Sequence, residues 1–153
     1  MCSVAVRNMS AQRGANLPAG VLTRDALAVV SDPEIDLVVE VIGGIEPARE
    51  LITTALRHGK PVVTANKEVM AKHGAELLAL ARQRGVDILY EASVGGGIPL
   101  LAPLKRALLA NELTSIQAII NGTTNYILTR MARGEFLGAA ALLVVCTLLA
   151  RLA

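Results

Sequence analysis

Aromatic side chains are scarce in this chain of 153 residues, which has two tyrosines, one phenylalanine and no tryptophan. Lysine and arginine number 15 against 13 aspartates and glutamates, for a formal net charge of +2, and no segment gathers the basic residues into a stripe. A nucleic-acid-binding protein needs basic surface for phosphates and commonly stacks bases on aromatic rings. The composition therefore predicts no nucleic-acid partner.

Cysteine and histidine are also scarce. Cys2 and Cys146 lie too far apart for a disulfide framework or a cysteine metal site, which favours a reducing compartment. The first residues, Met-Cys-Ser-Val-Ala-Val-Arg, lack the apolar core of a signal peptide, so we expect a cytoplasmic protein. His58 and His73 fall on predicted helices, and no Ser/His/Asp or Cys/His arrangement is expected.

Apolar sequence, in contrast, is abundant, and the mean hydropathy is +0.51. Part of this value comes from buried parallel strands, which are continuous apolar runs. Residues 136–150 carry no charge. A helix of that length spans about 22 Å, whereas the hydrocarbon core of a bilayer is roughly 30 Å thick. We expect a buried helix here, with a membrane anchor and a non-native sequence as the alternatives.

The spacing of the apolar residues changes repeatedly between strand-like and helix-like along the chain. Thr23 is expected to be a helix N-cap and Pro47 to lie in a first helical turn. Gly59 and Gly85 stand where helices are expected to end. The expected strands are 3–7, 36–42, 61–65, 86–91 and 113–120, and the expected helices are 23–30, 46–58, 67–84, 98–110 and 123–133.

This alternation of strands and helices with short connections predicts an α/β fold with a doubly wound parallel sheet. Such sheets bind ligands beyond the carboxyl ends of their strands. Gly43-Gly44, residues 64–67 and residues 91–97 each follow an expected strand, so we expect a site where they meet. A dinucleotide-binding domain normally opens with a strand and a Gly-x-Gly-x-x-Gly turn. No such turn occurs before residue 40, so the sheet is expected to begin one βα unit late.

Three ordered motifs carry a resemblance to a known family. They are Val63-Thr-Ala-Asn-Lys67, Glu91-Ala-Ser-Val-Gly-Gly-Gly-Ile-Pro99 and Asn121-Gly-Thr-Thr-Asn-Tyr-Ile-Leu-Thr129. With these motifs the chain resembles the homoserine dehydrogenases over most of its length. The resemblance implies an oxidoreductase that interconverts aspartate 4-semialdehyde and L-homoserine with NADH or NADPH, on the route to threonine and methionine. It also implies a Rossmann-like cofactor domain, an α+β catalytic and dimerisation domain, and a homo-oligomer.

The same resemblance implies roles for residues near the nicotinamide and pyrophosphate of the cofactor. Lys67 matches a lysine that polarises the aldehyde oxygen and supports proton delivery, with a solvated lysine as the alternative. Thr64 matches a polar residue near the nicotinamide, with strand-end turn chemistry as the alternative. Gly43 and Gly44 match a turn that passes the ribose and pyrophosphate, with a plain strand-to-helix turn as the alternative.

Other matches concern the adenosine end and a returning segment. Arg7 matches a position near the adenosine ribose, where a cation can accept a 2′-phosphate with help from Arg13. This placement favours NADP over NAD, although a surface arginine explains Arg7 equally well. Asn121, Gly122 and Thr123 match the segment where the chain crosses back toward the cofactor, with an N-cap as the alternative for Thr123.

A last match concerns a monovalent cation, generally sodium. The Glu91 carboxylate and the backbone carbonyls of Val94, Gly96 and Ile98 match the family's cation site. Carboxylate and carbonyl oxygens are the ligands that a hard cation prefers. The alternative is a capped glycine turn in which Glu91 forms a salt bridge.

The chain departs from the family pattern after about Arg133, where the expected acidic residues and a second catalytic lysine have no counterparts. We therefore expect a partial NAD(P)-binding Rossmann domain over 1–92, the start of the catalytic domain over 93–133, and an atypical tail over 134–153 from a frameshifted or truncated reading. Such a fragment is expected to be inactive by itself. The alternatives are a non-catalytic truncated subunit, a tail-anchored interaction protein, and a Rossmann dehydrogenase of another substrate.

Overall fold

A computed structural model describes residues 2–14, 16–117 and 122–134 of the chain. By its internal contacts the chain divides into two units, Met1–Ala110 and Asn111–Ala153, and each is described by itself. Among the described residues, no helix is both long enough and apolar enough to cross a membrane. The apolar residues 136–150 lie outside the described part.

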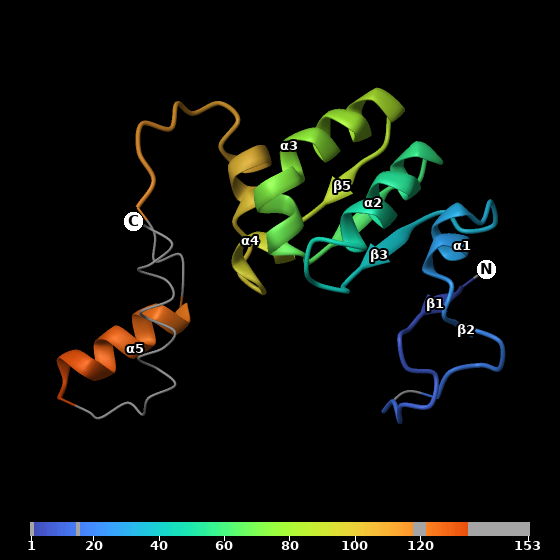
Figure 1. The fold of residues 1–153 in the computed structure, drawn as a ribbon. Coiled ribbons are helices and arrows are strands. Elements are labelled where there is room, and N and C mark those ends of the chain that lie inside the picture. The colour runs from blue at the N-terminus through green and yellow to red at the C-terminus, as the bar shows by residue number, and fades with distance from the viewer. Residues whose placement is uncertain (1, 15, 118–121, 135–153) are drawn as a thin grey trace. The chain divides into compact units, whose positions relative to one another are not determined.

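All the strands of the first unit are parallel, and they form two sheets (Figure 1). β1 pairs with β2, and a three-stranded sheet has the order β3-β4-β5. In register, Val38 of β3 lies beside Val62 of β4, which lies beside Ile88 of β5. The bounds are β1 Val4–Ala5, β2 Leu22–Thr23, β3 Val38–Glu40, β4 Val62–Thr64 and β5 Ile88–Leu89. The predicted parallel α/β fold is confirmed.

Helices cover one face of the three-stranded sheet. Val38, Val62 and Ile88 are buried in a single core cluster together with apolar residues of three helices. The alternate strand positions face the other way, where Val39 and Leu89 are 61% and 56% exposed. The three helices are α1 (Ala26–Ser31), α2 (Ala48–Arg57) and α3 (Lys67–Arg84).

Helix α3 begins and ends where local sequence signals predict. The Asn66 side chain precedes the helix and accepts a hydrogen bond from the backbone N–H of Val69, at 3.1 Å. Gly85 follows Arg84 with a φ of 67°, a left-handed conformation that glycine adopts at little cost. Capping at both ends therefore confirms the predicted helix over 67–84.

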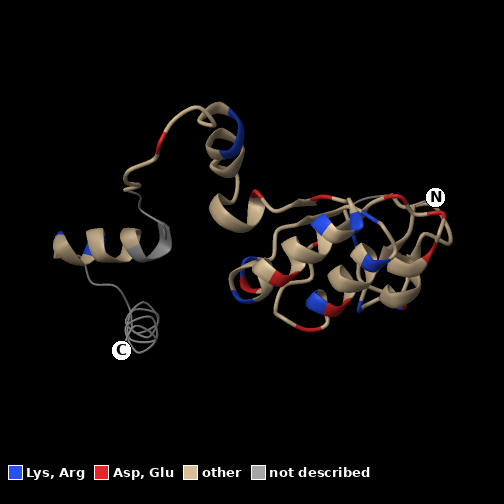
Figure 2. Cartoon of the chain, turned by 90° about the horizontal axis from the view of Figure 1, so that it is seen from above, with Lys and Arg blue, Asp and Glu red and all other residues tan. Residues whose placement is uncertain are grey.

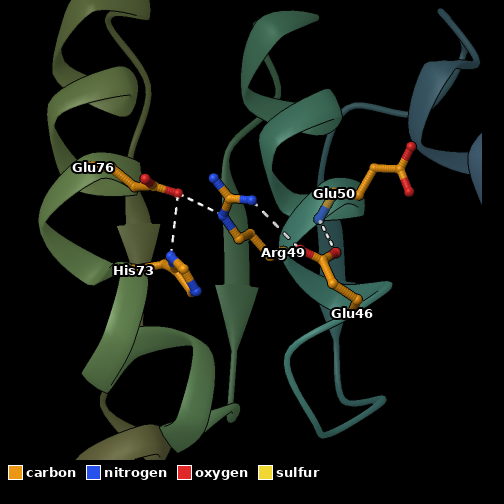
Figure 3. A network of polar contacts seen from close by, with 5 residues as sticks. All are labelled: Glu46, Arg49, Glu50, His73 and Glu76. Atoms are coloured by element: carbon orange, nitrogen blue, oxygen red, sulfur yellow. Dashed lines mark hydrogen bonds and ion pairs between the residues drawn. The ribbon is translucent and has the colours of Figure 1, made fainter.

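A polar network on the surface joins α2 to α3 (Figure 3). Arg49 of α2 donates from Nε to Oε1 of Glu76 in α3, at 2.6 Å, and its Nη1 lies 3.5 Å from Glu46. His73 Nδ1 lies 3.5 Å from the same Glu76 oxygen. The hydrogen bond from Arg49 lowers the pKa of Glu76, and it raises the pKa of Arg49. Elsewhere on these helices, charges of both signs alternate over the surface (Figure 2).

Two predictions for the first unit need correction. Thr23 lies in β2, and Asp25 caps α1 instead, its Oδ1 accepting from the Ala28 N–H at 2.9 Å.

The helix expected over 98–110 is shorter than predicted: residues 101–107 are helical, and the last five of them form a π-helix, η1 (Pro103–Ala107). A separate short helix, α4 (Ala92–Gly95), precedes this segment. Pro103 lies in the first turn of this segment, where a missing N–H costs no intrahelical hydrogen bond, and its carbonyl accepts from the N–H of Leu108, five residues on, at 3.1 Å.

The second unit contains one helix among its described residues, α5 (Gly122–Ala132), which confirms the helix predicted over 123–133. The strand predicted over 113–120 is wrong for its described part, because residues 112–117 have no regular structure. A segment of alternating apolar and polar residues forms a strand only when another strand pairs with it. The described residues of this unit include no such partner strand. Residues 118–120 lie outside the described part.

Candidate functional site

Three loops follow the carboxyl ends of β3, β4 and β5, as the sequence predicts, and hydrogen bonds join them. The loop after β3 contains Gly43 and Gly44, and the loop after β4 leads through Asn66 into α3. Short α4 follows β5, and its Ser93 hydroxyl donates to the carbonyl of Thr64 at 3.0 Å. The carboxyl edge of this sheet is therefore one connected surface.

Glu40, the last residue of β3, is the centre of this edge, and the sequence analysis missed it. Its carboxylate is only 3% exposed. One oxygen accepts from the Thr64 hydroxyl at 2.6 Å, and the other accepts from the N–H of Ile42 at 2.7 Å. The second oxygen also lies 3.4 Å from the Gly43 N–H. The sequence did contain one signal for this role, a carboxylate inside the apolar run of residues 37–42. A buried charge needs hydrogen-bonding partners, so such a carboxylate indicates a polar network around it.

Asn66 ties the glycine loop to the start of α3. Its side chain is buried, its Nδ2 donates to the Gly44 carbonyl at 2.7 Å, and its Oδ1 caps the helix through Val69. The backbone N–H of Asn66 donates to the Thr64 hydroxyl at 3.0 Å. One side chain thus holds the turn after β3 and the N-terminus of the helix after β4 at a fixed separation.

The glycine loop has a backbone conformation that residues other than glycine adopt only at a cost in free energy. Gly43 and Gly44 have φ values of +78° and +73°, both in the left-handed region. Both glycines are exposed, and no other atom lies within 4 Å of the place where a Cβ would stand on either one. The loop therefore offers bare backbone at the carboxyl edge of the sheet, where ligands of such folds bind.

Lys67 and Thr64 take different positions at this edge. Lys67 is exposed and is the first residue of α3, so its ammonium stands at the positive end of a helix dipole. An ammonium and a helix N-terminus together favour an anionic or strongly polarised oxygen. Thr64 is 1% exposed, and its hydroxyl both donates to Glu40 and accepts from Asn66. Its hydroxyl is therefore engaged in holding the edge together.

Glu91 follows β5 and acts as a cap in this structure. Its carboxylate accepts from the backbone N–H groups of Leu100, Leu101 and Ala102, the last two at 2.7 and 2.9 Å. The hydrogen bond from Leu100, followed by those from the other two, lowers the pKa of Glu91. A carboxylate has about four lone-pair positions, and the three N–H groups use most of those of Glu91. A cation at this loop would therefore depend mainly on the carbonyl oxygens of Val94, Gly96 and Ile98.

The remaining predicted site residues belong to other segments of the chain or lie outside the described residues. Arg7 is exposed, two residues beyond β1, whereas Arg13 donates to the carbonyls of Asn8 and Ala11 in its own loop. Gly122 and Thr123 lie in the first turn of α5, in the second unit. Asn121 lies outside the described residues.

Comparisons with known proteins agree with this geometry. Residues 1–91 match the family model described as the NAD binding domain of homoserine dehydrogenase, and residues 99–143 match the model described as homoserine dehydrogenase. The homoserine dehydrogenase of Synechocystis sp. is 54% identical over 129 residues, which cover 84% of this chain and 30% of that protein. The enzyme of Bacillus subtilis is 48% identical over 130 residues, with coverage of 85% and 30%.

Solved structures give the same result. The homoserine dehydrogenase of Thiobacillus denitrificans superposes with a TM-score of 0.70 at 52% identity, covering 73% of this chain and 26% of that one. A hyperthermophilic archaeal homoserine dehydrogenase in complex with NADPH has a TM-score of 0.70 at 31% identity, with coverage of 84% and 40%. The chain spans about 30% of the length of the curated relatives that it matches. By its family models, its relatives and its fold, the chain belongs to the homoserine dehydrogenase family.

Proposed function

We propose that this chain carries the cofactor-facing part of a homoserine dehydrogenase, an NAD(P)H-dependent oxidoreductase that interconverts aspartate 4-semialdehyde and L-homoserine. The observation that supports this most is the connected carboxyl edge, on which Glu40 and Asn66 hold the bare glycine loop beside the N-terminus of α3. A glycine loop with exposed backbone and a helix N-terminus with its lysine fit a phosphorylated cofactor and a polarised substrate oxygen.

Lys67 is the residue we assign to catalysis. The bound nicotinamide supplies the hydride to the carbonyl carbon. The Lys67 ammonium stabilises the negative charge that develops on the aldehyde oxygen and supports the delivery of a proton to it. Its exposed position at the start of α3 leaves it free to meet a substrate.

The other assignments are proposals that rest on the family resemblance. We propose that the cofactor is NADP or NAD, and that a small-molecule substrate, a cytoplasmic location and a homo-oligomer go with the whole protein. On the same basis we propose a sodium ion at the Glu91 loop and the domain limits 1–92, 93–133 and 134–153. The proposed cofactor-binding residues are Arg7, Gly43, Gly44, Thr64, Lys67, Asn121, Gly122 and Thr123.

The test places residues 4–131 of this chain in a full-length homoserine dehydrogenase in exchange for the matching segment. We expect Lys67→Ala to lower kcat by at least about tenfold, a bound set below the roughly 10²–10⁴-fold that one positioned proton-transfer group contributes. Lys72→Ala is the matched control, because Lys72 is exposed on the same helix. Rates are followed at 340 nm. Equal kcat and KM in the Lys67 variant and the parent would contradict the catalytic assignment and show that Lys67 is a solvated lysine.

A further inference from the structure

The Glu40 carboxylate is a buried charge that no cation balances directly. All its hydrogen-bond partners are neutral donors: the Thr64 hydroxyl, the Asn66 amide and the backbone N–H groups of Ile42 and Gly43. Among the residues that the structure describes, no lysine, arginine or histidine forms an ion pair with it. Hydrogen bonds of this kind stabilise a carboxylate but leave its negative charge in place.

This charge lies close below the exposed surface of the carboxyl edge. Gly43 is exposed, and its backbone nitrogen lies 3.4 Å from a Glu40 oxygen. Ala65 is exposed as well, and it directly follows Thr64, whose hydroxyl donates to the other oxygen. A ligand that rests on Gly43 and Ala65 therefore meets the field of the carboxylate mainly through protein, where a charge is screened less than in water.

Lys67 brings a positive charge to the same edge, but its situation differs. It is exposed, so water and dissolved ions screen its ammonium, whereas the Glu40 carboxylate is buried. The two side chains form no ion pair. The ammonium of Lys67 therefore offsets the field of Glu40 only in part.

The two forms of a nicotinamide cofactor differ in charge at the ring. The reduced ring is neutral. When it gives a hydride to the carbonyl carbon it becomes a pyridinium cation, and the carbonyl oxygen takes up a proton. A fixed negative charge near the ring therefore interacts differently with the two forms, as protein charges near the reactive ring of a cofactor do in general.

We propose that Glu40 is a specificity-determining residue that favours the oxidised cofactor over the reduced one. It acts through its charge from below the edge, and it does not touch the cofactor. The same charge favours the step in which the hydride leaves, because the ring becomes positive in that step. This inference rests on the proposed function, which assigns Thr64, the partner of Glu40, to the cofactor site.

The test uses the full-length enzyme that carries residues 4–131 of this chain. The Kd of NADPH is measured by its fluorescence, and the Kd of NADP⁺ by competition with NADPH. We expect Glu40→Gln to raise the ratio of the NADP⁺ Kd to the NADPH Kd by at least about fivefold, a modest bound for one unit charge at an effective dielectric constant of about 20. A variant that only disturbs the edge weakens both forms alike and leaves this ratio unchanged.

Thr64→Val is the matched control. It removes the hydroxyl that donates to Glu40 at 2.6 Å, and it keeps the carboxylate. We expect weaker binding of both cofactor forms with little change in their ratio. A change in the ratio as large as that of Glu40→Gln would show that the geometry of the edge, and not the charge of Glu40, discriminates between the forms.

If Glu40→Gln fails to fold, the parent enzyme provides the test. An analogue of NADP⁺ with benzamide in place of nicotinamide has nearly the same shape and no charge on its ring. We expect it to bind at least about fivefold more weakly than NADP⁺, and equal affinity would overturn the inference.

Two further results have different meanings. The same ratio of Kd values in the parent and in Glu40→Gln would overturn this inference alone, because the enzyme would still bind its cofactor. A folded enzyme that binds neither NADPH nor NADP⁺ would overturn the proposed function, and this inference with it.

Discussion

Glu40 joins the loops after β3 and β4, although it lies in the middle of an apolar segment. Its partners stand at a distance in the sequence: Thr64 is 24 residues away and Asn66 is 26. Sequence patterns report on neighbours within a few residues, so they single out Glu40 as a carboxylate in an apolar run but do not identify its partners. The motif residues Thr64, Asn66 and Lys67 could therefore be found from the sequence, whereas the way in which Glu40 holds them could not.

We predict that Glu40→Gln destabilises the fold by about 1–3 kcal/mol, the cost of a buried group without a matching partner. The amide replaces one acceptor oxygen by a donor, which must then face either the Thr64 hydroxyl or the N–H groups of Ile42 and Gly43. Urea unfolding followed by circular dichroism measures the change. Glu50→Gln is the control, since Glu50 is exposed on α2. Equal midpoints for the two variants would contradict the role assigned to Glu40.

At the scale of elements, the accuracy of sequence prediction followed the strength of the local signals. Helix α3 was predicted to both ends because Asn66 and Gly85 mark its caps within the sequence itself. The helix expected over 98–110 starts later than predicted, because the Glu91 carboxylate accepts from the N–H groups of residues 100–102 and so marks the start of the helical segment. This cap comes from nine to eleven residues away, and the apolar spacing carries no sign of it. The strand predicted from Leu113 onward was wrong for another reason. A strand forms only beside a partner strand, and no local pattern in the sequence reveals whether that partner is present.

The contact between α2 and α3 gives a prediction about pH. Because its pKa is lowered in the folded chain, the Glu76 carboxylate contributes stability above its ordinary pKa, and this contribution is lost as the pH falls through the lowered value. The midpoint of thermal unfolding should therefore be higher for the parent than for Glu76→Gln at pH 7. The difference should shrink below about pH 4, and also in about 1 M salt, where screening acts within roughly 3 Å.

Asp87→Asn is the control for this experiment, because Asp87 is an exposed carboxylate near the end of the same helix–strand connection. The side chains of Arg49 and Glu76 are 40% and 48% exposed, so solvent screens the ion pair and the effect is expected to be small. A difference between parent and Glu76→Gln that stays constant from pH 7 to pH 3 would show that the ion pair with Arg49 does not join the helices.

At the scale of the whole molecule, the described residues offer only part of what the proposed cofactor needs. The edge after β3, β4 and β5 is connected, but the sequence contains no Gly-x-Gly-x-x-Gly turn to receive a pyrophosphate. We therefore predict that the 153-residue chain binds NADPH weakly and turns over homoserine negligibly. A fluorescence titration with NADPH and an initial rate at 340 nm measure the two quantities. Saturation at micromolar NADPH, or a substantial rate with the pure chain, would contradict this prediction.

The sheet face that carries Val39 and Leu89 has a consequence for the lifetime of the protein in a cell. Exposed apolar strands are the surfaces that chaperones and proteases act on. A chain that keeps such a face open is removed unless a partner covers it. We therefore expect this face to shorten the lifetime of the chain wherever nothing covers it.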